Sequence, residues 1–220
     1  MQLEAFIFDL DGVLTDTAKF HFQAWKRLAD EMEAEFNWEI NHQLRGVSRR
    51  QSMEIIFKDR DLSEEEIQAG MARKNSYYQA LIMRMSPSDV LPGALELLQA
   101  LREQGIKIGL GSASKNARTV LNAIGLTPLM DVIGDGYSVE RSKPEPDLFL
   151  FVAHELGAKP ENCVVFEDAE AGIEAANHAG MYAVGIGSTE RLQGADVVYP
   201  NLEGLSLDTV EQDLEAARAY

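Results

Sequence analysis

Residues 3–12, LEAFIFDLDG, join a short apolar run to two carboxylates and a glycine. The run from Leu3 to Phe8 is rich in Phe and Ile and ends at a polar turn, which is typical of a buried strand in a parallel sheet. Asp9 then follows the carboxyl end of that strand, where open parallel sheets bind their ligands. An extended conformation places Asp9 and Asp11 on one side of the chain, where they repel unless a cation or a proton joins them. Taken alone, the same residues also fit an ordinary acidic turn.

Composition indicates a globular protein of ordinary make-up. The 220 residues, 45% hydrophobic and 25% charged, suffice for one large domain or for a core with a modest insertion. The chain has no leading basic-then-apolar signal and no apolar run long enough to cross a bilayer, so we expect a cytoplasmic protein. A formal net charge of -16 argues against nucleic acid or an anionic membrane as partner. An anionic small substrate remains compatible, provided that basic residues converge locally or a metal supplies positive charge. Cys163 is the only cysteine, which excludes an internal disulfide and predicts a small buried apolar group.

Residues 17–86 show only helical periodicity. Apolar side chains recur at helical spacing around residues 20–32 and 53–57, and a capping box at residues 63–66 predicts a third helix that reaches about Met83. Strand-like alternation is missing from this block. It is therefore predicted to form a small α-helical cap domain.

From residue 94 onward, short apolar runs alternate with amphipathic helices, several of which stop at a glycine. We expect helices at 94–104, 116–124, 147–156, 170–179 and 207–218, and strands at 106–111, 131–134, 163–166, 183–186 and 195–199. This alternation predicts an α/β fold with a Rossmann-like parallel sheet, right-handed crossovers and helices on both faces. Because the first strand belongs to the same sheet, residues 1–16 and 87–220 form one predicted core. The helical block is then an insertion in the first crossover and a candidate lid over the strand ends.

Polar residues also follow three later strands. Ser112 comes after the second strand, ahead of a helix start whose free N–H groups can bind an anion. Lys143 lies in a loop that two prolines stiffen, and Glu167 and Asp168 end another strand, where they are costly near Asp9 without a cation. Each feature alone is more often a helix cap, a solvated lysine or a pair of helix-start acids. Their conjunction at one edge of one sheet indicates a site.

These residues fit a magnesium-dependent phosphoryl transfer. The acids at the two strand ends offer hard oxygen ligands to Mg²⁺, which also keeps waters and a substrate phosphate. Ser112 and Lys143 would hold the charge of the phosphate, and Lys143 would offset the charge on Asp9. Asp9 would attack phosphorus in line and carry the phosphoryl group as an aspartyl phosphate. Asp11 would pass a proton to or from the substrate oxygen.

In this order and at these separations, the Asp9-x-Asp11-Gly12 segment, Ser112, Lys143 and the Glu167-Asp168 pair resemble the four motifs of the haloacid dehalogenase superfamily. The resemblance covers essentially the whole chain and includes a helical cap inserted after the first motif. Within the superfamily, the chain is most similar to the beta-phosphoglucomutase family. The segments that carry this similarity are FDLDGV (8–13), DT (16–17), HFQAW (21–25), LRGVSR (44–49), RKN (73–75), SASKN (112–116), SKP (142–144) and EDAEAG (167–172).

The resemblance implies roles for individual residues. Asp9 would be the phosphorylated nucleophile and Asp11 the general acid/base. Mg²⁺ would be held by Asp9, Glu167, Asp168 and the backbone carbonyl of Asp11. His21 would couple cap closure to the position of Asp11, and Arg49 would bind the phosphate that is not being transferred. Contacts to sugar or phosphate would come from Thr17, Trp25, Leu44, Gly46, Val47, Ser48, Lys74, Ala113, Ser114, Lys115 and Asn116. Ala169 stands where many relatives are expected to carry a hydroxyl.

Without the resemblance, the cap residues favour plainer interpretations. His21 and Trp25 are four residues apart on one helix face and fit packing, and Arg49 and Lys74 fit solvated charges. An acidic protein that binds a doubly phosphorylated sugar, however, needs cations on both sides of its site.

Two enzymes and one signalling protein remain compatible with the sequence. The leading hypothesis is a monomeric mutase that interconverts beta-D-glucose 1-phosphate and D-glucose 6-phosphate, with beta-D-glucose 1,6-bisphosphate as the activating intermediate. The alternative is a sugar-phosphate phosphatase of the same superfamily, which differs in whether the closed cap excludes water. A phosphate-accepting receiver module shares the acids, the hydroxyl and the lysine, but the cap insertion and the chain length argue against it.

Overall fold

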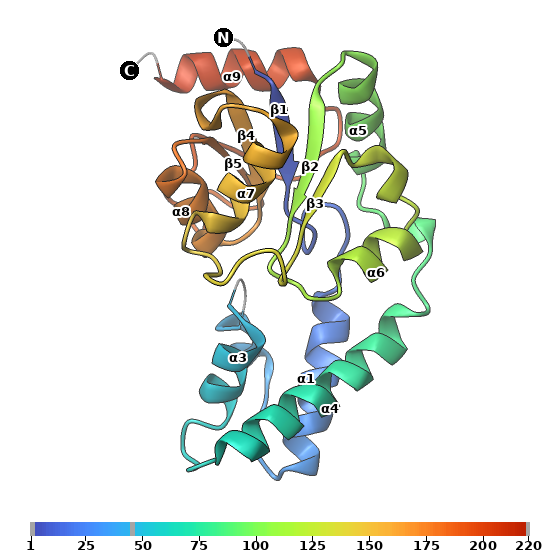
Figure 1. Cartoon of the computed structure of the whole chain (residues 1–220), viewed down its shortest axis with the longest axis vertical. Coiled ribbons are helices and arrows are strands. Elements are labelled where there is room, and N and C mark those ends of the chain that lie inside the picture. The colour runs from blue at the N-terminus through green and yellow to red at the C-terminus, as the bar shows by residue number, and fades with distance from the viewer. Residues whose placement is uncertain (1–2, 45–46, 219–220) are drawn as a thin grey trace.

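The computed structural model describes residues 3–44 and 47–218 and places β1 (Ala5–Phe8) in the middle of a six-stranded parallel sheet (Figure 1). The strand order is β3-β2-β1-β4-β5-β6, so β1 is flanked by two strands that come much later in the chain. Every residue of β1 is buried, as expected for a parallel strand with helices on both faces. The strand order reverses at β1, because β2 and β3 are added on one side of it and β4, β5 and β6 on the other. This switch point is where open sheets of this kind bind ligands.

The remaining elements follow the predicted alternation. The strands are β2 (Lys107–Gly111), β3 (Val132–Gly134), β4 (Cys163–Glu167), β5 (Tyr182–Ile186) and β6 (Val197–Tyr199). The core helices are α5 (Ala94–Glu103), α6 (Ala117–Ala123), α7 (Asp147–Leu156), α8 (Glu170–His178) and α9 (Leu207–Arg218), with 3-10 turns at Pro87–Asp89, Thr127–Leu129 and Pro160–Asn162. The inserted helices are α1 (Ala18–Glu31), α2 (Trp38–His42), α3 (Arg49–Ile56) and α4 (Glu64–Ile82). The predicted fold class is confirmed, and the predicted ends of the core strands and helices differ from the observed ends by at most two residues.

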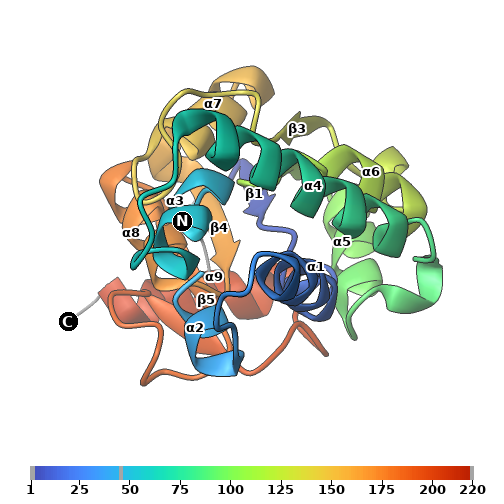
Figure 2. The same ribbon diagram turned by 90° about the horizontal axis from the view of Figure 1, so that it is seen from below.

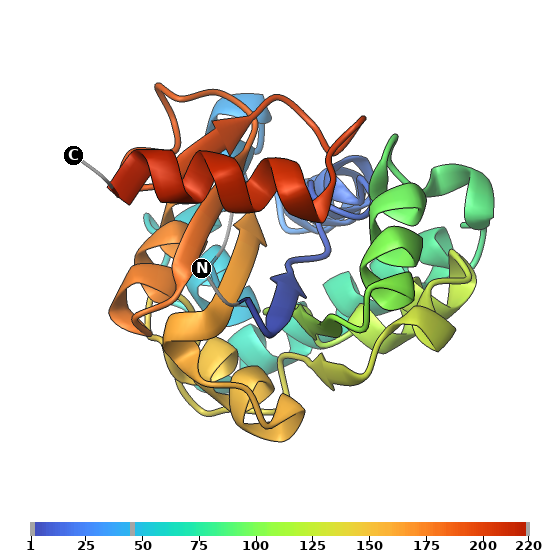
Figure 3. The ribbon, with the colours of Figure 1, turned by 90° about the horizontal axis from the view of Figure 1, so that it is seen from above.

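Two helical layers cover the sheet because the side chains of each strand alternate between its faces. Phe6 and Phe8 of β1 pack with helices α5, α6 and α9 on one face, whereas Ala5 and Ile7 pack with α7 and α8 on the other (Figure 3). In the described part of the chain, no helix is long and apolar enough to span a membrane.

The insertion has an apolar core of its own, with Trp25, Leu28, Met53 and Phe57 among its buried members. The division at residues 17–86 stays a prediction. Helix α2 within it was not predicted, because five residues hold too few apolar repeats to show a helical period. Helix α4 reaches out of this core toward the sheet domain and passes near α6 (Figures 1 and 2).

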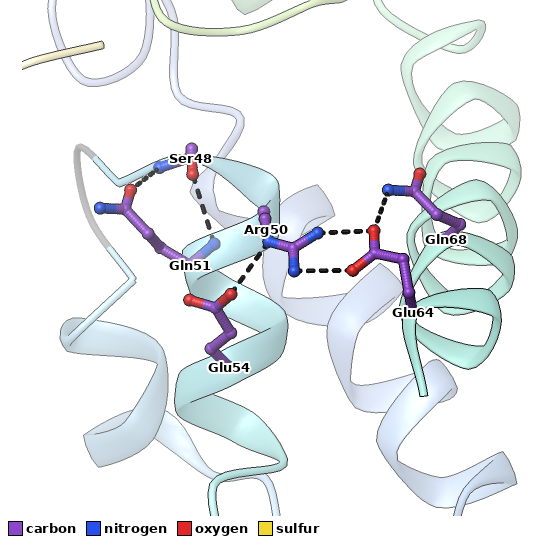
Figure 4. A network of polar contacts seen from close by, with 6 residues as sticks. All are labelled: Ser48, Arg50, Gln51, Glu54, Glu64 and Gln68. Carbon is purple, nitrogen blue, oxygen red and sulfur yellow. Dashed lines mark hydrogen bonds and ion pairs between the residues drawn. The ribbon is translucent and has the colours of Figure 1, made fainter. Parts of the chain in front are cut away.

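Helices α3 and α4 are tied together by a surface ion-pair network (Figure 4). Arg50 of α3 donates two hydrogen bonds to the carboxylate of Glu64 at the start of α4, at 2.7 and 2.8 Å, and a third to Glu54 at 3.0 Å. The bonds from Arg50, followed by one from Gln68, lower the pKa of Glu64 to about 2. A capping box at Ser48 starts α3 immediately before two adjacent arginines. The network therefore links α3 to α4 at the exposed surface of the cap.

The chain returns from the cap to the core at Gly93, which caps α5 with a φ of +81°. A Cβ on Gly93 would lie 2.3 Å from the carbonyl carbon and oxygen of Leu202. Gly105, at the other end of α5, has a φ of +74°, but a Cβ there would meet nothing within 4 Å. The two glycines thus share the left-handed conformation and differ in the space around it.

Replacing each glycine by alanine separates these two effects. We expect Gly105→Ala to lower the free energy of unfolding by about 1 kcal/mol, from the left-handed conformation alone. Gly93→Ala should cost about 1–3 kcal/mol more, because its Cβ also displaces backbone. Urea unfolding of both variants measures the difference, and equal losses would contradict the close approach to Leu202.

Candidate active site

A buried lysine lies between two buried acids at the centre of the sheet edge. Phe8 of β1 pairs in register with Phe166 of β4, so the residues that follow them, Asp9 and Glu167, are neighbours. The ammonium of Lys143 donates to Oδ1 of Asp9 at 2.7 Å and to Oε1 of Glu167 at 2.5 Å. Burial opposes the charge on Lys143, which is only 4% exposed, but the two acids outweigh it and raise the pKa of the ammonium above its ordinary value.

Glycines make room for this cluster. A Cβ on Gly172 of α8 would lie 2.0 Å from the carboxyl carbon of Glu167. A Cβ on Gly12 would lie 2.5 Å from the carboxyl carbon of Asp168. Larger residues at either position would push a carboxylate out of place, so the Asp-Gly turn and the start of α8 are part of the site.

Three of these acids form a candidate Mg²⁺ site. One carboxylate oxygen from each of Asp9, Glu167 and Asp168 lies within 4.8 Å of the other two. Hard oxygen donors in this number suit Mg²⁺, which takes few carboxylates and completes its shell with waters and phosphate. Burial raises the pKa of Glu167 to about 7; Lys143 opposes the shift, and Asp9 and Asp168 add to it. The donor set therefore fits the predicted ion, and a divalent cation would relieve the repulsion among the acids.

The extended conformation that was expected to place Asp9 and Asp11 on one side of the chain stops before Asp11, and the two carboxylates have different hydrogen-bond partners. Strand β1 ends at Phe8, and Asp11 lies in the turn beyond it. Its backbone N–H donates to Oδ2 of Asp9 at 2.9 Å, while its carboxylate accepts a hydrogen bond from the hydroxyl of Thr17. Burial, followed by the charge of Asp9, raises the pKa of Asp11 to about 7. A carboxyl group with this pKa can both give and take a proton near neutral pH.

A lysine and a histidine from two cap helices meet beside Asp11. The ammonium of Lys74 lies 2.8 Å from Nδ1 of His21, and its Nζ is 4.8 Å from the ring centres of both Trp25 and Tyr78. Burial, followed by the charge of Arg49, holds the pKa of Lys74 well below its ordinary value, although Asp11 opposes the shift. Burial, and then Lys74, likewise hold the pKa of His21 low. The pair links α1 to α4, and because both pKa values are lowered, it carries less positive charge than two fully protonated basic side chains would.

The loop between β2 and α6 supplies the predicted anion-binding face. Ser112 is buried, and its hydroxyl accepts the backbone N–H of Ser114 at 3.2 Å. The hydroxyl of Ser114 in turn accepts the N–H of Asn116 at 3.2 Å. The Asn116 amide points to the cap and donates to Asn75 of α4 at 2.9 Å. Arg49 of α3 donates to the same oxygen at 2.8 Å, so the predicted phosphate ligands of both domains lie together.

The other predicted contact residues are placed as follows. Leu44, Val47 and Ser48 precede the start of α3. Thr17 is buried next to Asp11, and Ala113 lies between Ser112 and Ser114. Lys115 is exposed, and its ammonium lies 5.0 Å from the centre of the Tyr137 ring. Trp25 is packed in the cap core, as the plainer interpretation had it, and a substrate contact for it stays a prediction. Gly46 lies outside the described residues.

Three polar or aromatic residues lie in this region although the sequence assigned them no role, and one of them, Asn75, belongs to the RKN segment of the family similarity. They are Asn75, Tyr78 and Gln79, all on α4. Tyr78 packs its ring 4.1 Å from that of His21, and Gln79 donates to the Asn116 carbonyl oxygen at 3.3 Å. Tyr78 lies four residues after Lys74, and Gln79 lies four residues after Asn75, so each pair shares a helix face, but a helix of 19 residues offers many such pairs.

Comparison with known proteins agrees with this geometry. The family described as haloacid dehalogenase-like hydrolase matches residues 3–180. The chain is 41% identical over 220 residues to the beta-phosphoglucomutase of Bacillus subtilis (strain 168), covering 98% of this chain and 97% of that protein. It is 29% identical over 181 residues to a phosphorylated carbohydrates phosphatase of Thermotoga maritima, covering 81% and 82%. The crystal structure of beta-phosphoglucomutase from Clostridium difficile superimposes with a TM-score of 0.94 at 39% identity, covering 100% of both chains.

The raised pKa of Asp11 predicts how stability depends on pH. Because the folded protein holds this proton up to about pH 7 and the unfolded chain releases it near 3.8, the folded state binds more protons between these values. The free energy of unfolding should therefore fall as pH rises through this window, and Glu167 acts in the same sense. Asp11→Asn should remove about 1–3 kcal/mol of that decline.

Urea unfolding at pH 4 and pH 8, with a chelator present, measures the decline for each protein. Asp16→Asn removes an exposed carboxylate from the same turn and serves as the matched control. If Asp11→Asn and the native protein lose equal stability between the two pH values, the protonated state of Asp11 is refuted.

Proposed function

The chain belongs to the haloacid dehalogenase-like hydrolase family, and from this membership and the geometry of the site we propose that it interconverts beta-D-glucose 1-phosphate and D-glucose 6-phosphate. One observation carries the proposal: two separate groups of phosphate ligands meet at the boundary between cap and core. One group surrounds Asp9 and Lys143, and the other joins Arg49 of the cap to Asn116 of the core. A substrate with phosphates at both ends of a sugar would occupy both groups at once.

The proposed reaction uses Asp9 as a carrier of the phosphoryl group. An oxygen of Asp9 attacks one phosphorus of beta-D-glucose 1,6-bisphosphate, and the bond from that phosphorus to the sugar oxygen breaks. Asp11 gives its proton to the departing sugar oxygen, which leaves a sugar monophosphate and an aspartyl phosphate. The phosphoryl group on Asp9 then passes to beta-D-glucose 1-phosphate: Asp11 takes the proton of the 6-hydroxyl, that oxygen attacks phosphorus, and the bond to Asp9 breaks, which forms the bisphosphate again. The bisphosphate turns end for end and gives its 1-phosphoryl group to Asp9, which releases D-glucose 6-phosphate.

The neighbouring residues hold the groups in place for this exchange. Lys143 keeps one oxygen of Asp9 fixed, and the N–H of Asp11 keeps the other fixed. Mg²⁺, bound by Asp9, Glu167, Asp168 and the backbone carbonyl of Asp11, would neutralise the charge of the transferring phosphoryl group. Ser112 would donate a hydrogen bond to a phosphoryl oxygen. His21, through its contact with Lys74, would couple closure of the cap to the position of Asp11.

A sugar-phosphate phosphatase is the second candidate, since one relative bears such a name. The higher identity and the fuller coverage of the beta-phosphoglucomutase relative favour the mutase. Membership in this family removes the support for a receiver-type signalling module. One chain carries every residue of the proposed site, so we propose that a monomer suffices, and we retain the cytoplasm as the proposed location.

A coupled assay for glucose 6-phosphate tests the proposal, with beta-D-glucose 1-phosphate, Mg²⁺ and a trace of the bisphosphate. We expect turnover that a chelator abolishes and that Asp9→Asn lowers by at least about 10³-fold, because no carrier of the phosphoryl group remains. Circular dichroism of Asp9→Asn shows whether the variant is folded. Release of inorganic phosphate without isomerised sugar would establish the phosphatase instead.

A further inference from the structure

Two donors from different domains converge on one neutral oxygen. Oδ1 of Asn75 accepts a hydrogen bond from Nη2 of Arg49 at 2.8 Å and another from Nδ2 of Asn116 at 2.9 Å. Arg49 and Asn75 belong to cap helices α3 and α4, whereas Asn116 precedes core helix α6. Gln79, one turn further along α4, donates to the other end of the Asn116 amide at 3.3 Å. Asn75 therefore sits at a junction that only the assembled cap and core can form.

The charge of Arg49 is left uncompensated at this junction. Among residues 3–44 and 47–218, no carboxylate forms an ion pair with Arg49, and loss of water lowers the pKa of its guanidinium below the ordinary value. Its neighbour Arg50 is the opposite case, since Glu54 and Glu64 both pair with it. Adjacent arginines on one helix thus differ in one respect: one is neutralised by acids, and the other is oriented by an amide.

A neutral acceptor can orient a guanidinium without using up its charge. A carboxylate in the same place would form a stronger, charge-assisted bond and would repel an incoming phosphate. An apolar residue would leave both donors without a partner and free to turn away. The amide of Asn75 avoids both outcomes, so its chemistry suits a site that must keep positive charge available.

We infer that Asn75 is a positioning residue that aligns Arg49 and Asn116 for the phosphate group that is not being transferred, while leaving the charge of Arg49 free to bind it. This inference rests on the proposed function, because it assumes a ligand with two phosphates. It assigns to Asn75 no contact with the reacting atoms. The ion pairs of Arg50 with Glu54 and Glu64 lie at the exposed surface of the cap and include neither Arg49 nor Asn75 (Figure 4).

Asn75→Asp tests the inference because it keeps the shape and the accepting oxygen, while the amide NH₂ becomes a second oxygen and the side chain gains a negative charge. The probe is beta-D-glucose 1,6-bisphosphate, titrated by calorimetry into proteins that also carry Asp9→Asn so that the ligand is not consumed. We expect Asn75→Asp to weaken binding about 10- to 100-fold, which is the loss of one charge-assisted contact. Its melting temperature should stay equal or rise, because the new carboxylate pairs with Arg49; a merely structural role would predict a fall.

Arg50→Ala is the matched control, since it removes the adjacent guanidinium from the ion-pair network and not from the junction. Its affinity for the bisphosphate should stay within about twofold of the background. Asn75→Ala should weaken binding about tenfold by releasing both donors. Unchanged affinity in Asn75→Asp, with the background protein binding tightly, overturns the inference alone. A background protein that binds no bisphosphate overturns the proposed function and the inference with it.

Discussion

The ion triad of Asp9, Lys143 and Glu167 is the interaction on which the site depends. Buried charges are costly unless each is paired, and here one ammonium serves two carboxylates at the edge of the sheet. The register of β1 with β4 brings the two acids together, and the loop before α7 delivers the lysine. Because the acids outnumber the lysine, the cluster retains negative charge that a divalent cation can share. The same three side chains therefore pair the buried charges of the sheet edge and form part of the proposed site.

Helix α4 gives the cap its connection to this chemistry. Lys74 contacts His21 beside Asp11, and Asn75, the next residue, contacts Arg49 and Asn116. The same helix packs Tyr78 and Ile82 into the main core. One helix thus contacts the surroundings of Asp11, the proposed second phosphate site and the core, an arrangement that suits the proposed closure of the cap.

Much of this arrangement was predictable from the sequence, for a geometric reason. Parallel strands present their carboxyl ends at one edge, so polar residues after several strands must gather there whatever the exact strand ends. Asp9, Ser112, Lys143 and Glu167 were predicted on this ground. The extended conformation expected through Asp11 was wrong, because the strand ends at Phe8 and a turn follows it.

The contacts between cap and core were harder to predict. Asn75 and Gln79 act through contacts made across two domains, and neither residue type signals such a role by itself. Helix α2 is too short to show a period. The family resemblance supplied the roles of His21 and Arg49, whose plain chemistry fits packing or solvation equally well. The local sequence pattern therefore predicted the sheet and the polar residues at its edge. The contacts among Arg49, Asn75 and Asn116 could be identified only from the three-dimensional structure.

Direct detection of the phosphorylated residue tests the central claim most sharply. The protein is mixed with bisphosphate labelled in its phosphoryl groups, quenched in acid within one turnover and mapped by peptide mass spectrometry. The account predicts acid-stable, base-labile label on the peptide that contains Asp9, and none in Asp9→Asn. Turnover of the sugar with no label on the protein, or with label on another residue, would contradict it.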